Sequence, residues 1–220
     1  MSTAAEQAPL YRVSALATGF ARMWRAWRVL LPVVVVNALV QGILLLSGVL
    51  PYLTIVFALT ALLSFVILVA SFGLIAAAML QATEGAVSAG AAVDTLRDRT
   101  WPLLAWSLGL VLVVIAGFAL YLVPGFIVLA LSPYLLLAVM DGERNPIAVN
   151  VRTIGARWGR WLITVIAMGV VCFGMWFLSA LDGFFVTGAP GAIIAWLVLG
   201  MVASWFICAW ALIYRSVNPR

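Results

Sequence analysis

Asp141 and Glu143 form the only close pair of carboxylates in the chain, in the string MDGERNP. Two carboxylates at this spacing, with Arg144 beside them, have the groups to bind a metal ion or a lipid head group. A solvated turn followed by a helix cap is the commoner use of such a string, and that is the structure we expect. Asp182, which precedes Gly183, is expected to be a turn residue for the same reason.

The usual catalytic sets are missing from the sequence. The chain has no histidine, which excludes imidazole bases, imidazole metal ligands and Ser-His triads. Its two cysteines, Cys172 and Cys208, make neither a disulfide framework nor a zinc site, and we expect both to be small apolar packing residues. No phosphate-binding glycine loop and no GxSxG motif occurs. We therefore assign no catalytic, cofactor-binding or metal-binding residue, and expect a protein that is not an enzyme.

Asn37 and Gln41 are the polar pair that falls inside an apolar segment. They are four residues apart, so they share one helical face, beside Ala38 and Gly42. Such a face packs against another helix through hydrogen bonds and close backbone approach, and the alternative is a polar lining for a substrate cavity. Two further stripes of small residues predict packing seams within or between subunits: Gly73 with Ala77, and Gly200 with Ser204 and Cys208.

The elements that position these residues follow from the composition. The chain of 220 residues is 66% hydrophobic and 9% charged, whereas a soluble domain is about 45–50% apolar and about 25% charged. Its mean hydropathy is +1.22. We therefore predict one all-α integral membrane domain over residues 1–220, and no domain of another kind.

Charge-free runs give the number of spans. No charged residue occurs from 29 to 83 or from 100 to 140, and Asp182 is the only one from 161 to 214. One span needs about 20 residues, so each run holds two helices and a turn. The six predicted spans are residues 29–50, 52–81, 101–123, 125–140, 161–181 and 190–214. The fourth is short and contains Pro133, so we expect it to be kinked or partly re-entrant.

The basic residues predict the orientation. All twelve are arginines, and none lies in the three turns within the charge-free runs. They precede the first span, separate spans two from three and four from five, and follow the sixth: Arg12, Arg22, Arg25, Arg28, Arg97, Arg99, Arg144, Arg152, Arg157, Arg160, Arg215 and Arg220. Under the positive-inside rule both termini are cytoplasmic.

An amphipathic segment precedes each pair of spans. In the clearest one the apolar residues share one helical face and the arginines point away: Ile147, Val151, Ile154, Trp158 and Trp161. Asn145 and Pro146 are a suitable N-cap and first residue for it. The sequence thus predicts three hairpins, each preceded by a cytoplasmic interfacial helix, in pseudo-repeats 10–84, 85–144 and 145–214.

The arginines of these segments lie at the depth of the lipid head groups. Membrane phosphates are the nearest anions for a chain of net charge +5, so we expect lipid contacts and no nucleic-acid binding. The candidate head-group contacts are Arg22, Arg25, Arg28, Arg152, Arg157 and Arg160.

The stretch YLVPGFIVLALSPYLLLAVMDGERNPIAVNVRTIGARWGRWLITV (residues 121–165) carries a family resemblance. It resembles the six-span membrane domain found beside glycerophosphodiester phosphodiesterases and in related uncharacterised bacterial membrane proteins. The matching positions are Leu122, Pro124, Gly125, Pro133, Asp141, Arg152 and Trp158. The resemblance implies a six-span fold in a bacterial cytoplasmic membrane. It brings no catalytic residue, because the phosphodiesterase activity of such proteins belongs to a separate soluble domain.

Three functions are compatible with these features. The first is a non-enzymatic membrane protein that contacts lipids and assembles with itself or with other membrane proteins. The second is a transporter or lipid-translocating protein that uses the Asn37 and Gln41 face and the interrupted fourth span. The third, an intramembrane enzyme, lacks a nucleophile–base pair or a metal set. A cavity lined by Asn37 and Gln41 would favour the second.

Overall fold

The computed structural model describes residues 14–46, 54–182 and 189–219. Within these ranges every regular element is an α-helix. The helices are α1 (Ser14–Arg25), α2 (Trp27–Leu46), α3 (Ile55–Glu84), α4 (Ala89–Tyr121), α5 (Val123–Ala130), α6 (Leu135–Asp141), α7 (Pro146–Ala156), α8 (Trp158–Asp182) and α9 (Ala189–Arg215). Arg12, Arg220 and the turns expected at Gly48–Pro51 and after Asp182 lie outside the described residues.

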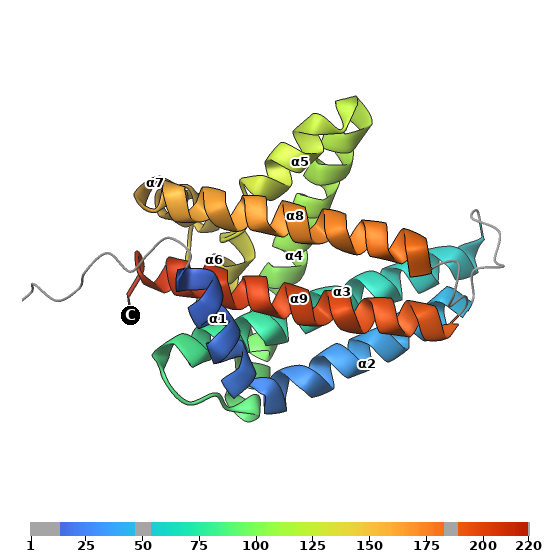
Figure 1. The fold of residues 1–220 in the computed structure, drawn as a ribbon, viewed down its shortest axis with the longest axis horizontal. Helices are drawn as coiled ribbons and strands as arrows, with labels where there is room; N and C mark the ends of the chain where they lie inside the picture. The colour runs from blue at the N-terminus through green and yellow to red at the C-terminus, as the bar shows by residue number, and fades with distance from the viewer. Residues whose placement is uncertain (1–13, 47–53, 183–188, 220) are drawn as a thin grey trace, which may run out of the picture.

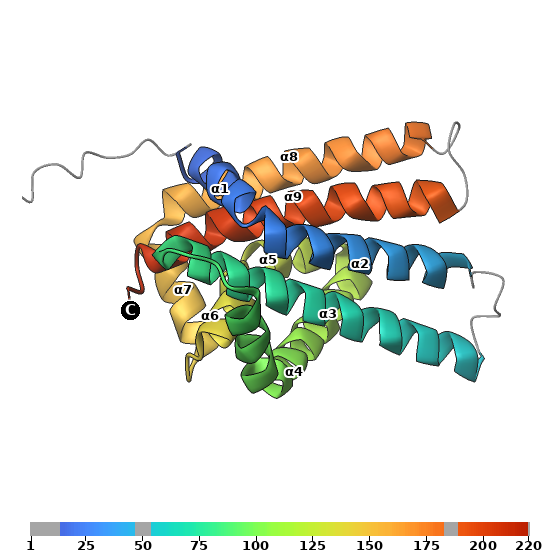
Figure 2. The same ribbon diagram turned by 90° about the horizontal axis from the view of Figure 1, so that it is seen from below.

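Six segments are long and apolar enough to cross a membrane: α2, α3, α4, α5 together with α6, α8 and α9. Each overlaps one of the six predicted spans, although α4 begins twelve residues before the predicted third span, and the chain is an all-α polytopic membrane protein. Helices α2, α3, α8 and α9 run along a common direction (Figures 1 and 2), and α9 packs against α1, α2, α3 and α8. The buried core between them includes Leu30, Met79, Phe206 and Tyr214.

Helices α1, α6 and α7 gather at the end of the bundle where α3 and α9 finish (Figure 1). We call this the arginine end, because α1, α7 and the last turn of α9 bring Arg22, Arg25, Arg152 and Arg215 to it. Gathering the arginines at one end matches the predicted topology, whereas the side of the membrane that this end faces stays a prediction.

The three amphipathic segments differ in how they join their spans. Ala26 alone separates α1 from α2, and Arg157 alone separates α7 from α8. The middle segment has no such break, because α4 continues from Ala89 through Pro102 to Tyr121. The first and third predicted repeats therefore share a short helix followed by two long ones, and the second departs from that pattern.

The fourth span is interrupted around Pro133, as predicted. Between α5 and α6 the backbone leaves the helix, and side chains of the next segment take up the freed groups. Asn150 donates through Nδ2 to Leu131 O at 2.7 Å and accepts from Tyr134 N at 3.0 Å. Trp161 Nε1 donates to Ala130 O at 2.8 Å. A broken helix inside a membrane is tolerated where protein groups replace the lost hydrogen bonds in this way.

Helices α4 and α5 form a tight hairpin that rises at a steep angle from the direction of the other long helices (Figure 1). Gly117 permits the approach, because a Cβ there would lie 2.7 Å from the backbone N of Gly125. Phe118 and Phe126 meet edge to face at 5.1 Å between ring centroids. Tyr121, at the tip, is 88% exposed, so only the base of this hairpin packs on the bundle.

The predicted small-residue seams join helices of one chain. A Cβ on Gly200 of α9 would lie 2.7 Å from Val34 Cγ1 of α2, and one on Gly42 would lie 2.3 Å from Ile193 Cγ1. Gly73 of α3 is equally close to Leu103 of α4. Small residues thus let these helices approach closely, where the sequence left open whether the seams lie within or between subunits.

Candidate functional site

The structure separates the two polar residues of the predicted Asn37–Gln41 face. Gln41 is a packing residue: its Oε1 accepts from Ser64 Oγ at 2.7 Å, and its Nε2 donates to Ser64 O at 3.3 Å. These bonds join α2 to α3. The packing interpretation therefore holds for Gln41.

Asn37 instead lines a cavity of about 340 Å³ between α2, α3, α4, α6 and α9, which we call the Asn37 cavity. Asn37 is 7% exposed and Ser107 of α4 is 4% exposed. Among the described residues, neither Asn37 Oδ1 nor Ser107 Oγ has a hydrogen-bond partner. The remaining wall is almost wholly apolar and includes Phe65, Phe72 and Trp196. Two of the residues that line this apolar space therefore each carry a buried polar atom without a partner.

A second cavity of about 350 Å³ lies beside the break in the fourth span, and we call it the Pro133 cavity. Phe72, Leu110 and Leu136 line both cavities and so separate them. Cys172 lines the Pro133 cavity and is exposed, whereas Cys208 is buried in the core. The packing prediction is confirmed for Cys208, and Cys172 lies at a surface.

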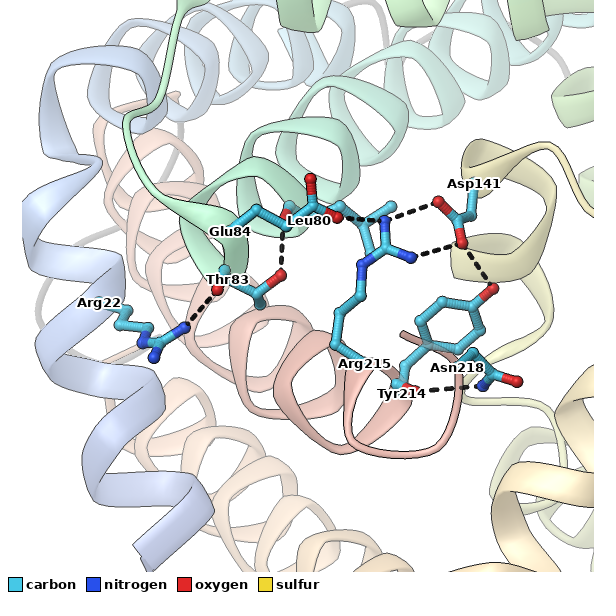
Figure 3. Close-up of polar contacts among 8 residues, drawn as sticks. All are labelled: Arg22, Leu80, Thr83, Glu84, Asp141, Tyr214, Arg215 and Asn218. Atoms are coloured by element: carbon cyan, nitrogen blue, oxygen red, sulfur yellow. Dashed lines mark hydrogen bonds and ion pairs between the residues drawn. The ribbon is translucent and has the colours of Figure 1, made fainter. Parts of the chain in front are cut away.

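A buried ion pair joins the ends of three helices at the arginine end. Arg215 of α9 donates two hydrogen bonds to the Asp141 carboxylate, each 2.7 Å long, and lies 2.9 Å from Glu84 Oε1 (Figure 3). Tyr214 Oη donates to Asp141 Oδ2 at 3.0 Å. This bidentate pairing of guanidinium and carboxylate fixes the relative orientation of the two side chains and also neutralises their charges. The ends of α3, α6 and α9 are therefore held together by one arginine.

The polar network extends to α7 through Asn218. Its Nδ2 donates to Thr153 Oγ1 at 3.0 Å and to Tyr214 O at 3.1 Å, and its Oδ1 accepts from Arg152. The chain after α9 is thereby fixed to α7.

The solvated turn expected at Asp141 and Glu143 is not what the structure has at Asp141. The Asp141 side chain is 6% exposed, because Arg215 and Tyr214 cover it. The turn itself is present: Gly142 takes the left-handed conformation at φ +86°, and Glu143 N donates to Ala138 O. Within the described residues no group of three His, Cys, Asp or Glu side chains could hold a metal ion.

The junction of α1 and α2 forms a surface pocket of about 430 Å³, lined by Trp24, Arg25, Trp27, Arg28 and Val87 among others. We call it the Trp24–Arg28 pocket. Arg28 lies over the Trp27 ring, with Cζ 5.9 Å from its centroid. Trp24 is 62% exposed and Trp27 47%. Two guanidinium groups framed by exposed indoles are suited to an anionic group at a membrane surface.

The six candidate head-group arginines divide by their protein contacts. Arg22 donates to Thr83 O at 3.0 Å and to Ala82 O at 3.4 Å, so it caps the C-terminal end of α3 (Figure 3). Arg152 donates to Asn218. Arg25, Arg28 and Arg157 are exposed, and Arg160 is half-buried.

The amphipathic helix α7 presents two faces. Val149, Asn150 and Thr153 are buried against the bundle, whereas Ile147 is 53% and Val151 61% exposed. The predicted apolar face is thus largely free at the surface, and asparagine and threonine form much of the inward one. The contact of the outer face with lipid stays a prediction.

No family model matches the chain, and neither does any curated protein or solved structure. The fold itself decides the class. The protein is a multi-pass membrane protein. The resemblance of residues 121–165 to the membrane domain beside glycerophosphodiester phosphodiesterases stays a prediction from the sequence.

The roles of Ser107 and Asn150 and the ion pairs of Arg215 were not predicted from the sequence. The ion pairs could have been predicted, since Glu84, Asp141 and Arg215 all lie at the ends of spans on the same predicted membrane face. Ser107 and Asn150 had no signal in the sequence beyond their polarity.

Proposed function

We propose that the protein is a non-enzymatic integral membrane protein that binds anionic lipid head groups at its arginine end. The Trp24–Arg28 pocket carries this proposal, because it places Arg25 and Arg28 beside exposed tryptophans. Tryptophan is favoured at the membrane–water interface, and one arginine guanidinium can bind two oxygens of a phosphate at once. Each arginine near an anionic bilayer surface contributes about 1 kcal/mol.

The proposal is tested by the thermal stability of the purified protein in detergent, with phosphatidylglycerol or phosphatidylcholine added. Phosphatidylglycerol should raise the Tm more, and added salt should reduce the difference. The double variant Arg25→Gln, Arg28→Gln should lose most of that difference. Arg97→Gln, an exposed arginine on α4 outside the pocket, is the matched control and should retain it. Equal losses in the two variants would contradict specific binding at the pocket.

A role in assembly belongs to the same proposal. The exposed apolar surface of α4, α5 and α8, with residues such as Leu120 and Val170 above 60% exposure, is available to lipid or to other membrane helices. Mild solubilisation of native membranes should recover the protein as an oligomer or with another membrane protein. A strictly monomeric species that copurifies with nothing would refute assembly, and turnover of an added lipid would refute the non-enzymatic role.

The Asn37 cavity supports a second candidate, transport or lipid translocation. Asn37 lies at the middle of α2, about 15 Å from the start of that helix. That is close to the centre of a hydrocarbon core about 30 Å thick. Gln41 does not contribute to this cavity, because Ser64 of α3 satisfies it.

A further inference from the structure

We propose that the Asn37 cavity binds a neutral lipid that carries a hydroxyl group, with the hydroxyl between Asn37 and Ser107 and a hydrocarbon chain along the apolar wall. The Trp24–Arg28 pocket plays no part in this inference. Binding of a neutral lipid in the Asn37 cavity goes beyond the head-group binding proposed above, and either proposal can fail while the other holds.

The polar atoms of the cavity indicate the group that is bound. Asn37 Oδ1 is an acceptor without a donor, and Ser107 Oγ can both donate and accept. Buried polar side chains are normally hydrogen-bonded, so two unpartnered ones in the same cavity point to an absent partner. A hydroxyl can donate to the amide oxygen of Asn37 and accept from the hydroxyl of Ser107. If the amide group is rotated so that Nδ2 takes the place of Oδ1, the same hydroxyl can accept from Nδ2.

The absence of charged residues among the described lining of the cavity excludes lipids that would enter it with a charged group. None of the described residues that line it is charged, and a phosphate or carboxylate near the centre of a bilayer would be costly without a partner. The bound molecule is therefore neutral at the end that enters. A hydroxyl there is also costly in plain hydrocarbon, and Asn37 with Ser107 offsets that cost.

The size and position of the cavity fit a chain that enters from the bilayer. Its volume of about 340 Å³ is within the range of about 300–1,000 Å³ for small-molecule sites. Val111 and Leu199 line it and are also exposed, at 38% and 39%. The exposed surface of a spanning helix faces hydrocarbon, so a lipid reaches the cavity sideways without passing through water.

The experiment uses the full-length protein in nanodiscs and a 1,2-diacylglycerol with a photoactivatable acyl chain, and maps the labelled residues by mass spectrometry. Labelling should fall on the cavity wall, at Phe65, Phe72 or Trp196. The same diacylglycerol with its hydroxyl acetylated should label these residues at least about fivefold less, the loss expected for one or two hydrogen bonds. A photoactivatable long-chain alcohol tests the other source of a lipid hydroxyl, and labelling by either supports the site.

Variants separate the hydrogen bonds from the cavity. Asn37→Leu and Ser107→Ala should each lower labelling by about three- to tenfold. Ser132→Ala, in the Pro133 cavity, is the matched control and should leave labelling unchanged, because Ser132 Oγ bonds to Val128 O. Asn37→Leu should keep or raise the Tm of the lipid-free protein, since it removes an unpartnered buried polar group. Ala203→Phe, which fills the cavity, should abolish labelling.

Two results would overturn the proposal. One is equal labelling by the free and the acetylated diacylglycerol, or by wild type and Asn37→Leu, which would make the site a general hydrocarbon groove. The other is the absence of label on the cavity wall with every probe, in which case the polar atoms are satisfied by water.

Discussion

Arg215 and Asp141 are a pair in which each side chain depends on the other. They lie 74 positions apart, and their side chains are 10% and 6% exposed. A buried charge that loses its partner remains desolvated, which makes breaking such a pair far more costly than losing a surface pair. Glu84 also contacts Arg215, but its side chain is 42% exposed, so water screens that contact.

Asp141→Asn is therefore expected to destabilise the protein by about 3 kcal/mol, the lower end for a broken buried pair, because the amide can still accept one bond. Glu84→Gln is the matched control and should cost less than about 1 kcal/mol. The free energy of unfolding in mixed detergent–SDS micelles measures both. Equal effects of the two variants would mean that Arg215 does not distinguish its partners.

At the scale of elements, the break between α5 and α6 depends on α7 and on the first turn of α8. Pro133 removes a backbone donor and ends the helix, which frees carbonyls and an amide at membrane depth. Asn150 satisfies Leu131 O and Tyr134 N, and Trp161 satisfies Ala130 O. Helix α7, which the sequence predicts to be an interfacial helix, thus also supplies hydrogen bonds to the backbone of the fourth span.

Asn150→Ala should leave the part-buried carbonyl of Leu131 and the buried amide of Tyr134 without partners and cost about 2–4 kcal/mol. Asn145→Ala removes the N-cap of the same helix, where Asn145 Oδ1 accepts from Ala148 N at 3.1 Å in an exposed position. It should cost only about 1 kcal/mol. Unfolding in mixed micelles compares the two, and a smaller effect at position 150 than at 145 would contradict the role of Asn150 in the break.

At the scale of the whole molecule, the orientation of the α4–α5 hairpin has the largest consequences. By length and composition α4 can span a membrane, and so can α5 together with α6, yet the α4–α5 hairpin rises at a steep angle from the other long helices (Figure 1). The predicted topology, with six spans and both termini inside, would place the exposed Tyr121 on the outer side. A hairpin that stayed within the bilayer would keep Tyr121 away from water.

Cysteine labelling in intact cells tests that topology, on a background of Cys172→Ala and Cys208→Ala. A membrane-impermeant reagent should label Tyr121→Cys. It should not label Ser88→Cys, in the turn before α4 at the arginine end, until the membrane is permeabilised. Protection of position 121 in both conditions would instead place the hairpin tip inside the bilayer or under a neighbouring subunit.

Much of the fold follows from properties of single segments. A charge in hydrocarbon is costly, so charge-free runs marked the six spans. An apolar helix satisfies its own backbone, so no partner is needed to predict it. Pro133 marked the interruption and Asn145 the start of α7, because both act on their own helix.

The site depended on which helices are neighbours and how each is rotated about its axis. Asn37 and Gln41 look equivalent in the sequence, yet Asn37 lines a cavity and Gln41 bonds to Ser64 of α3. The sequence around Asp141 predicts a solvated turn, whereas in the structure α9 places Arg215 against its carboxylate. Span number and breaks are local consequences of hydration, whereas cavities and ion pairs arise only when separate helices pack together.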